Sequence, residues 1–223
     1  MQKLIEGLRQ FMDSLRDSDR AFFEALAGGQ RPETLFITCS DSRVVPSLFT
    51  QTEPGDLFTI RNAGNLVPPA SDDGSGEAAA IEFAVRGLQV RDIVVCGHSH
   101  CGAIQGLMEP ARLATLPLVA RWLEHARDTR RIVDERHPDA DEATRLQRAI
   151  EVNVLVQLSH LTRHPAVAER LADASVHLYG WVYDIATGEV MAFDTATGGF
   201  TRLAEVSSAV AGLSGPELGR IVG

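Results

Sequence analysis

Two cysteines and one histidine lie at the ends of predicted β-strands, where their side chains could hold a metal ion. His98 and Cys101 follow the apolar run 92–97, and Cys39 ends a second apolar run that begins at Thr34. The carboxyl ends of parallel strands meet at one edge of an open α/β sheet, so these three side chains can converge. Two thiolates and one imidazole, with the fourth position left free, are the ligands of a catalytic zinc site. The sequence therefore predicts a zinc site made of Cys39, His98 and Cys101.

Cys96 offers a second way to build the same kind of site. It precedes His98 by two residues, and a strand would place both side chains on one face. A site made of Cys96, His98 and Cys101 would leave Cys39 unused. Because Cys96 lies inside an apolar run, a place in the core explains it better, but the spacing alone does not decide between the two sites.

Asp41 and Arg43 follow Cys39 directly after the first predicted strand. An Asp and an Arg two residues apart are commonly a surface ion pair that contributes little to stability. Beside a metal ligand the same pair could do chemistry, because the carboxylate would orient a water molecule on the metal. The fixed fork of guanidinium donors would in turn hold the carboxylate in place. We therefore predict a catalytic role for Asp41 and Arg43.

The elements that must position these residues alternate between strands and helices. Strands are predicted at 34–39, 57–60 and 92–97, with one helix opening at Pro46 and another capped by Ser75 between them. This order implies parallel strands joined by right-handed crossovers. We expect an α/β fold with a central, mostly parallel β-sheet flanked by helices.

The second half of the chain is predicted to be mainly helical. Long helices are expected at 116–136 and 141–163, and a shorter one at 165–173. The segments 176–185 and 189–194 are typical of an antiparallel β-hairpin at a sheet edge.

Both ends of the chain are predicted to be helical. The segment 3–15 has the apolar spacing of an amphipathic helix, which could pack on its own domain or on a partner subunit. A second helix is expected to begin at Asp19, and a weakly helical tail is expected from Arg202. With no linker or internal repeat, the 223 residues are expected to form a single domain.

Composition excludes several classes of function. The net charge of −9 argues against nucleic acid or an anionic membrane as a partner. The apolar runs fall short of the ~18 residues that a membrane span needs. Three cysteines do not form a disulfide framework, and the sequence lacks Gly-rich nucleotide-binding motifs. We expect a cytoplasmic protein.

Longer motifs resemble those of a known family, the β-class carbonic anhydrases. The segments Cys39-Ser-Asp-Ser-Arg43 and His98-Ser-His-Cys-Gly102 are similar to the paired signatures of that family. The resemblance covers most of the chain and is closest to the plant and cyanobacterial branch. It extends to the segments 29–32, 53–56, 61–69, 74–82, 116–125 and 179–185.

The resemblance implies an architecture and an assembly. The family has a central parallel sheet with one antiparallel edge strand and an N-terminal helical arm that embraces a second subunit. Residues 1–33 would form the arm, and residues 34–223 the α/β core with a C-terminal helical tail. The implied assembly is a homodimer or a higher even-numbered oligomer such as a homotetramer.

The resemblance also implies a reaction. One zinc ion per chain, on Cys39, His98 and Cys101, would work with a catalytic dyad of Asp41 and Arg43. The implied activity is the reversible hydration of carbon dioxide to bicarbonate and a proton, by attack of zinc-bound hydroxide. The alternatives are hydrolysis of carbon disulfide or carbonyl sulfide on the same scaffold, or a non-catalytic protein stabilised by zinc.

A substrate pocket is implied in the same way. Gln30 matches the glutamine that the family contributes across the dimer interface, and Phe58 and Ala63 match apolar positions of the carbon dioxide pocket. Phe83 stands where plant members have a tyrosine, so one pocket hydroxyl is missing.

Some family members are inhibited by bicarbonate bound to a Trp, an Arg and a Tyr. Arg61 and Tyr183 match two of these positions, but Phe36 stands at the third and has no indole N–H to donate. We therefore expect Asp41 to stay paired with Arg43 rather than to bind zinc.

Overall fold

The computed structural model describes residues 1–70 and 74–203 of the chain. These residues divide into two compact units, Met1–Arg31 and the residues from Pro32 onward. The predicted helical tail falls mainly at 204–223, outside the described residues.

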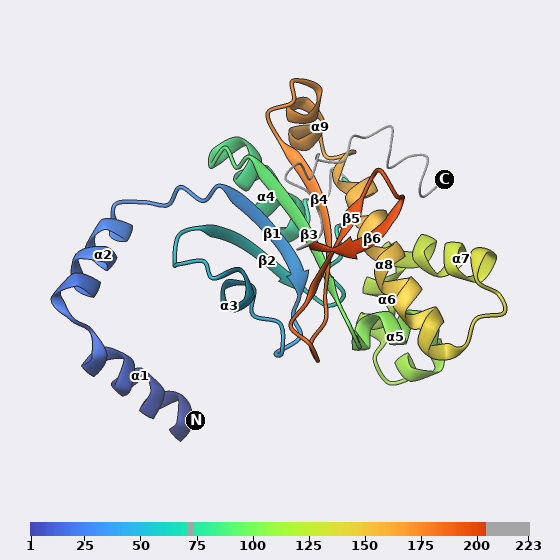
Figure 1. Ribbon diagram of the computed structural model, residues 1–223, viewed down its shortest axis with the longest axis horizontal. Helices are drawn as coiled ribbons and strands as arrows, with labels where there is room; N and C mark the ends of the chain where they lie inside the picture. Colours follow the sequence, from blue (N-terminus) through green and yellow to red (C-terminus); the bar gives the residue numbers. More distant parts are fainter. Residues whose placement is uncertain (71–73, 204–223) are drawn as a thin grey trace. The chain divides into compact units, whose positions relative to one another are not determined.

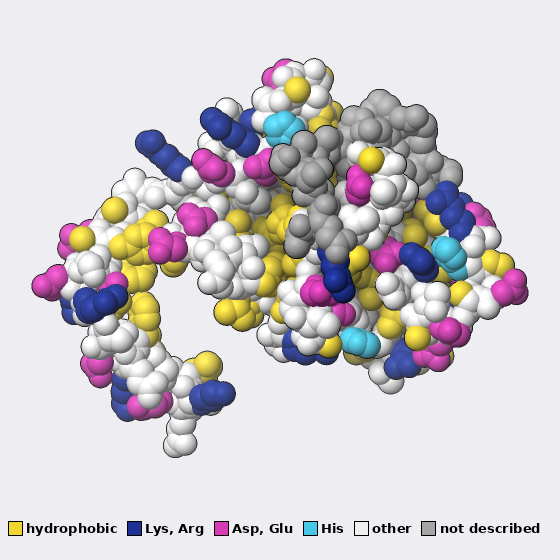
Figure 2. Space-filling view, in the orientation of Figure 1, with side chains coloured by type: hydrophobic (Ala, Val, Ile, Leu, Met, Phe, Trp, Pro, Cys, Tyr) yellow, Lys and Arg dark blue, Asp and Glu magenta, His cyan; other side chains and the backbone are white. Residues whose placement is uncertain are grey.

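The first unit consists of two helices, α1 (Gln2–Ser14) and α2 (Asp17–Ala27) (Figure 1). The predicted amphipathic helix is confirmed as α1. α2 begins two residues before Asp19, because the Asp19 carboxylate accepts a hydrogen bond from the Arg16 N–H at 2.9 Å and closes a capping box. Hydrophobic side chains of this unit reach the surface (Figure 2). The exposed apolar residues of α1 include Leu4, Ile5, Leu8, Phe11 and Met12.

A six-stranded sheet forms the centre of the second unit, in the order β2-β1-β3-β4-β5-β6 (Figure 1). The strands are β1 (Thr34–Cys39), β2 (Leu57–Asn62), β3 (Asp92–His98), β4 (His177–Tyr183), β5 (Val190–Asp194) and β6 (Gly199–Arg202). β1 to β4 are parallel, and β5 and β6 pair antiparallel. The predicted α/β fold is confirmed.

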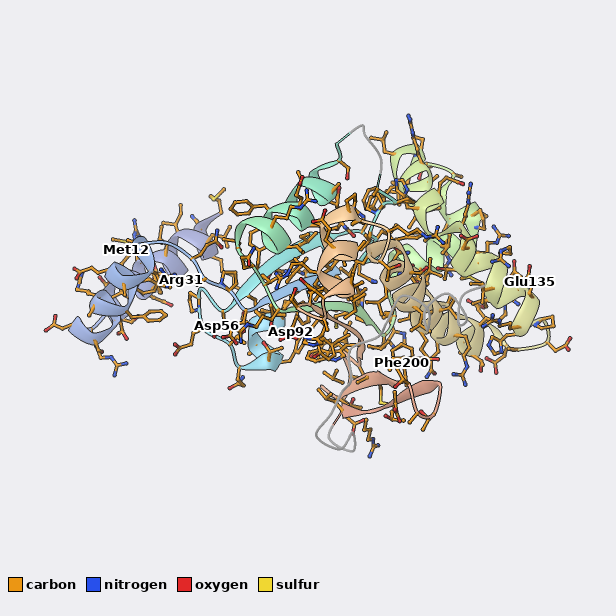
Figure 3. All side chains as sticks on the ribbon, turned by 90° about the horizontal axis from the view of Figure 1, so that it is seen from above. Met12, Arg31, Asp56, Asp92, Glu135 and Phe200 are labelled. Atoms are coloured by element: carbon orange, nitrogen blue, oxygen red, sulfur yellow. The ribbon has the colours of Figure 1, made fainter. Side chains whose placement is uncertain are left out.

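The antiparallel edge differs in one respect from the expectation. It contains two strands rather than one, and Figure 3 marks the outer strand by Phe200. Arg202, which was expected to begin the helical tail, instead ends β6. The Phe193 and Phe200 rings pack edge to face with centroids 5.4 Å apart, so apolar burial explains why this segment adds to the sheet.

The parallel register brings the ends of three strands to one edge of the sheet. Cys39 pairs with Asn62 of β2, and Thr38 pairs with Cys96 of β3. His98 is the last residue of β3. The side chains with predicted chemistry therefore follow neighbouring strand ends, as the order of elements requires.

Seven α-helices surround the sheet within the described part of the second unit. They are α3 (Pro46–Thr50), α4 (Gly76–Glu82), α5 (Gly102–Met108), α6 (Pro117–Leu123), α7 (Arg127–Arg136), α8 (Glu142–Leu161) and α9 (Pro165–Ala172). Shorter turns lie at Phe83–Gly87, Pro110–Leu113 and Glu124–Ala126. None of the helices in the described ranges has both the length and the apolar character needed to cross a membrane.

The prediction of one continuous helix at 116–136 is wrong, because the segment contains two helices. A 3₁₀ turn at Glu124–Ala126 separates α6 from α7, because Ala126 leaves the helical region with φ −113° and ψ 12°. The helix predicted at 141–163 is confirmed as α8, which the Asp141 side chain caps.

α8 packs very closely on the middle of the sheet. A Cβ added to Gly97 of β3 would lie 3.0 Å from Val154 Cγ2. A Cβ added to Gly180 of β4 would lie 3.0 Å from both Leu158 Cδ1 and Val154 Cγ1. Only glycine permits such a close approach of a helix to a strand. The close packing on β3 and β4 also places α8 beside the loop that follows β2.

Buried side chains fill both faces of the sheet. The larger cluster includes Leu35, Ile37, Ile93, Val95 and Leu178, which pack against residues of α4, α8 and α9. The opposite face buries Phe36, Val94 and Cys96. Each large aliphatic side chain buried in this way contributes about 1.5–3 kcal/mol to the hydrophobic stabilisation.

Candidate metal centre

The structure brings Cys39, His98 and Cys101 together at the carboxyl edge of the sheet. Their possible ligand atoms all lie within 4.8 Å of one another, and the Cys39 and Cys101 sulfurs are 3.9 Å apart. The three residues are 5%, 0% and 1% exposed, respectively. Cys39 ends β1, His98 ends β3, and Cys101 precedes α5, so regular elements fix all three backbones.

The imidazole of His98 has the tautomer and the free lone pair that a metal ligand needs. Its Nδ1 lies 2.9 Å from the Ser99 carbonyl oxygen, which requires an N–H there and leaves the lone pair on Nε2. Nε2 is buried and has no hydrogen-bond partner among the described residues. A buried acceptor without a partner costs free energy, and a cation between the three ligand atoms would satisfy it. The residues present therefore fit a zinc ion.

The two thiols have opposite tendencies to ionise. A hydrogen bond from Cys101 lowers the pKa of Cys39, and the Gly64 N–H, 3.5 Å from the sulfur, acts in the same direction. The neighbouring Cys39 sulfur, followed by burial, raises the pKa of Cys101. The site therefore stabilises one thiolate readily, and a bound cation would allow the second thiol to ionise beside it.

Cys96 does not belong to this group. It lies in the cluster on the other face of the sheet with Phe36 and Val94, and its thiol donates to the Gly97 carbonyl oxygen at 3.4 Å. Complete burial raises the pKa of the Cys96 thiol to about 12. The geometry therefore favours Cys39 over Cys96 as the partner of His98 and Cys101.

Asp41 and Arg43 form a two-pronged ion pair beside the three ligand residues. Arg43 Nε donates to Asp41 Oδ1 at 2.9 Å, and Arg43 Nη2 donates to Oδ2 at 2.7 Å. Asp41 Oδ2 also lies 3.9 Å from His98 Nε2. The hydrogen bond from Arg43 holds the pKa of Asp41 well below its usual range, so the carboxylate is ionised at neutral pH.

Arg61 holds the backbone between Cys39 and Val44. Its Nε donates to the Cys39 carbonyl oxygen at 3.2 Å, and its Nη2 donates to the Asp41 and Val44 carbonyl oxygens at 2.7 and 2.8 Å. The resemblance pointed to Arg61 only as part of a regulatory pocket. Its role in shaping this turn leaves no signal in the sequence, because the partners are backbone atoms.

Of the predicted pocket residues, Phe58 and Phe83 are in contact with each other, and Ala63 lies against Trp122. The Phe58 and Phe83 rings pack against each other with centroids 5.9 Å apart, and Phe83 is 50% exposed. The Ala63 carbonyl oxygen accepts a hydrogen bond from Trp122 Nε1 at 2.8 Å. Gln30 is exposed and belongs to the first unit, Met1–Arg31.

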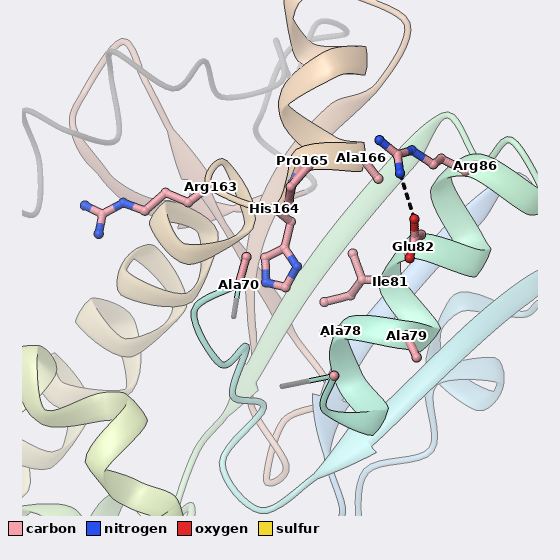
Figure 4. Close-up of a pocket in the computed structure, with 11 residues that line it drawn as sticks. Ala70, Ala78, Ala79, Ile81, Glu82, Arg86, Arg163, His164, Pro165 and Ala166 are labelled. Atoms are coloured by element: carbon pink, nitrogen blue, oxygen red, sulfur yellow. Dashed lines mark hydrogen bonds and ion pairs between the residues drawn. The ribbon is translucent and has the colours of Figure 1, made fainter. Parts of the chain in front are cut away.

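A separate cavity of about 500 Å³ lies between α4 and the start of α9 (Figure 4). His164 lines it, together with Arg86, which is paired with Glu82 at 2.7 Å. None of the predicted site residues lines this cavity, so it is distinct from the metal centre.

Comparison with known proteins gives one family. A family model described as carbonic anhydrase matches residues 34–190. A carbonic anhydrase from Synechocystis is 48% identical over 195 residues, which are 87% of this chain and 71% of the relative. A carbonic anhydrase from Pseudomonas aeruginosa is 47% identical over 205 residues, which are 92% and 93% of the two chains.

Solved structures agree with the sequence relatives. The β-carbonic anhydrase CcaA superposes with a TM-score of 0.88 at 46% identity, covering 91% of this chain and 98% of that one. A tetrameric β-carbonic anhydrase from Sordaria macrospora gives a TM-score of 0.78 at 31% identity, covering 90% and 98%. These relatives do not favour a carbon disulfide hydrolase or a non-catalytic zinc protein. Since family model, relatives and fold agree over most of its length, the chain belongs to the β-class carbonic anhydrases, zinc enzymes that hydrate carbon dioxide reversibly to bicarbonate and a proton.

Proposed function

We propose that Cys39, His98 and Cys101 hold the zinc ion of this carbonic anhydrase. The observation that carries the proposal is the buried group of three ligand atoms within 4.8 Å, with His98 Nε2 lacking a hydrogen-bond partner among the residues that the structure describes. Bound there, zinc supplies Lewis-acid chemistry that lowers the pKa of a water molecule to about 7.

Asp41 and Arg43 orient the reacting water in this proposal. The Asp41 carboxylate is ionised and lies 3.9 Å from His98, so it can accept a hydrogen bond from a water molecule in the same space. That bond would direct an oxygen lone pair toward carbon dioxide. Arg43 keeps the carboxylate in position through two N–H donors.

The substrate would lie against an apolar wall, because carbon dioxide is small and carries no net charge. Phe58, Ala63 and Phe83 are the proposed wall, and the contact between the Phe58 and Phe83 rings supports a shared place for these two. Gln30 of a facing chain would hold the substrate from the other side. The proton released by hydration leaves to solvent or buffer.

A homodimer is the proposed minimal active unit, with residues 1–33 as an arm of a single functional domain. The exposed apolar side chains of α1 support a helix that is covered by another subunit. The tetrameric relative from Sordaria macrospora supports an oligomer. We propose a cytoplasmic enzyme, since the net charge of −9 does not suit binding to nucleic acid or to an anionic membrane.

A pair of serine substitutions tests the zinc ligands. Cys39→Ser should lose both zinc and carbon dioxide hydration, while Cys96→Ser should keep both, because Cys96 lies on the other face of the sheet. Zinc per chain is measured by atomic absorption, and hydration by the rate of proton release. The opposite pattern, with zinc lost only in Cys96→Ser, would overturn the assignment.

A further inference from the structure

The loop after β2, residues 63–68, is held by buried polar side chains from α8 and from the turn that follows this helix. Asn153 and Gln157 are fully buried, and His160 and His164 are nearly so. Burial of such groups is costly unless each one finds a hydrogen-bond partner. The hydrogen-bond partners of these four side chains therefore show their structural role.

All four side chains bind backbone atoms of this loop. Asn153 Nδ2 donates to the Gly64 carbonyl oxygen at 3.0 Å, and Gln157 Oε1 accepts from the Val67 N–H at 2.8 Å. His160 Nδ1 lies 2.8 Å from the Val67 carbonyl oxygen. His164 Nε2 lies 2.9 Å from that of Pro68.

The Asn153 amide is itself fixed by two donors. Gln157 Nε2 donates to Asn153 Oδ1 at 3.0 Å, and Thr129 Oγ1 donates to the same oxygen at 3.3 Å. With its oxygen occupied in this way, Asn153 must present its NH₂ group to Gly64. The position of Gly64 is therefore tied to a saturated network in the core.

The peptide group between Ala63 and Gly64 connects this loop to the metal centre. Trp122 Nε1 donates to its carbonyl oxygen at 2.8 Å, and its N–H lies 3.5 Å from the Cys39 sulfur. Because a trans peptide is planar, its C=O and N–H point in opposite directions. Holding the oxygen on one side therefore aims the N–H at the sulfur on the other.

The backbone conformation and surroundings of residue 64 favour glycine over any other residue. Its φ of +84° lies in the left-handed region, and a Cβ there would come within 3.3 Å of Ala103 Cβ on α5. The loop can thus approach the metal centre closely enough for its backbone to bind a sulfur.

We propose that Trp122 and Asn153 are positioning residues of the metal centre, which hold the Gly64 N–H against the Cys39 sulfur. This inference rests on the proposed ligation of zinc by Cys39. An N–H donor stabilises the negative charge of a thiolate and limits the electron density that the thiolate gives to the metal. Without that donor, Cys39 would be a less well oriented ligand with a different donor strength.

The two tryptophans of the chain provide a matched test. Trp122→Phe keeps an aromatic ring but removes the N–H that binds Ala63. Trp181→Phe removes an N–H that has no partner among the described residues. Zinc affinity is measured by competition with a chelator, and the thiolate-to-metal absorption band is recorded after replacing zinc with cobalt(II).

We expect Trp122→Phe to weaken zinc binding about 10- to 100-fold and to shift the cobalt band, while Trp181→Phe changes neither. Asn153→Leu should act in the same direction and provides a second, independent variant. Wild-type affinity and an unshifted band in a folded Trp122→Phe or Asn153→Leu protein would overturn the inference, even if thermal stability fell. Zinc retained by Cys39→Ser would instead overturn the proposed ligation, so the two failures are distinguishable.

Discussion

At the scale of single residues, the charge of Asp41 is decided by one guanidinium. Two hydrogen bonds from Arg43 lower the pKa of this carboxyl group. Because the pKa is lowered, the ion pair stabilises the fold at every pH above the ordinary carboxyl pKa of about 3.9. This stabilisation is lost only as the pH falls through the lowered pKa. Asp41 therefore does not titrate between pH 5 and pH 9, and it remains a hydrogen-bond acceptor over that range.

Asp41→Asn and Arg43→Lys should both lower kcat/KM for carbon dioxide hydration by about 10- to 100-fold. The first removes the charge, and the second keeps a charge but lacks the planar fork that binds both carboxylate oxygens. Stopped-flow proton release gives the rate, and metal analysis provides the control, because neither side chain is a proposed ligand. Full activity of either variant would contradict the proposed role of the dyad.

Two buried histidines should make stability depend on pH. Burial lowers the pKa of both His160 and His164, so the unfolded chain binds more protons than the folded one just below pH 6.5. The contribution of the two neutral histidines to the free energy of unfolding is therefore fully present above that pH. It is lost as the pH decreases.

Substitution by amides should remove this dependence. His160→Asn and His164→Gln each keep an N–H donor near the position of the bonded ring nitrogen but cannot titrate. Below pH 6.5, the slope of unfolding free energy against pH should decrease by up to about 1.4 kcal/mol per pH unit for each histidine. Urea unfolding between pH 5 and pH 8 measures it, and equal slopes in variant and wild type would refute the argument.

At the scale of elements, the contact between α8 and β4 depends on a missing side chain. A Cβ on Gly180 would lie 3.0 Å from Val154 and Leu158, both fully buried, and the β-branched Val154 has little freedom to move. Gly180→Ala should therefore destabilise the protein by about 1–3 kcal/mol. Gly76→Ala is the control, because a Cβ there meets nothing within 4 Å. Equal unfolding midpoints for the two variants would contradict this account.

The order of elements could be predicted from sequence because apolar runs and caps are local signals. β1, β3 and α8 were found in this way, and so was the convergence of the residues at and just after the ends of β1 and β3. The choice between Cys39 and Cys96 could not be made from the spacing alone, since it depends on which face of the sheet each side chain takes. β6 and the turn at Glu124–Ala126 were missed, because neither has a distinctive residue pattern. The structural roles of Trp122 and Arg61 could not be predicted for a different reason: both side chains bind backbone carbonyl oxygens, which any sequence supplies.

At the scale of the whole molecule, the first unit poses a question of assembly. Residues 1–31 form a compact unit of their own, and the apolar side chains of α1 are exposed. Gln30 lies at the end of this unit and is also exposed. In the proposed homodimer, this unit would gain stability by covering a second copy of the chain.

Mixed dimers can test whether two chains share one site. Gln30→Ala and Cys39→Ser should each be inactive alone, for lack of a substrate contact and of a zinc ligand, respectively. In a mixed dimer, one site would combine the intact ligands of the first chain with the intact glutamine of the second. Activity should therefore return in heterodimers isolated with two different affinity tags. No recovery in such heterodimers would show that Gln30 acts within its own chain.

The pairing of β1 with β3 also determines when the metal centre can form during folding. Cys39 and Cys101 are 62 residues apart, and the sequence between them includes β2, α4 and all of β3. A contact of that separation forms slowly during folding, because a long loop must close before it is stabilised. A newly made chain therefore presents its cysteines singly until the two central strands have met. Zinc capture should therefore be a late event in maturation, and a chain stalled before that step should bind the metal more weakly than the folded chain.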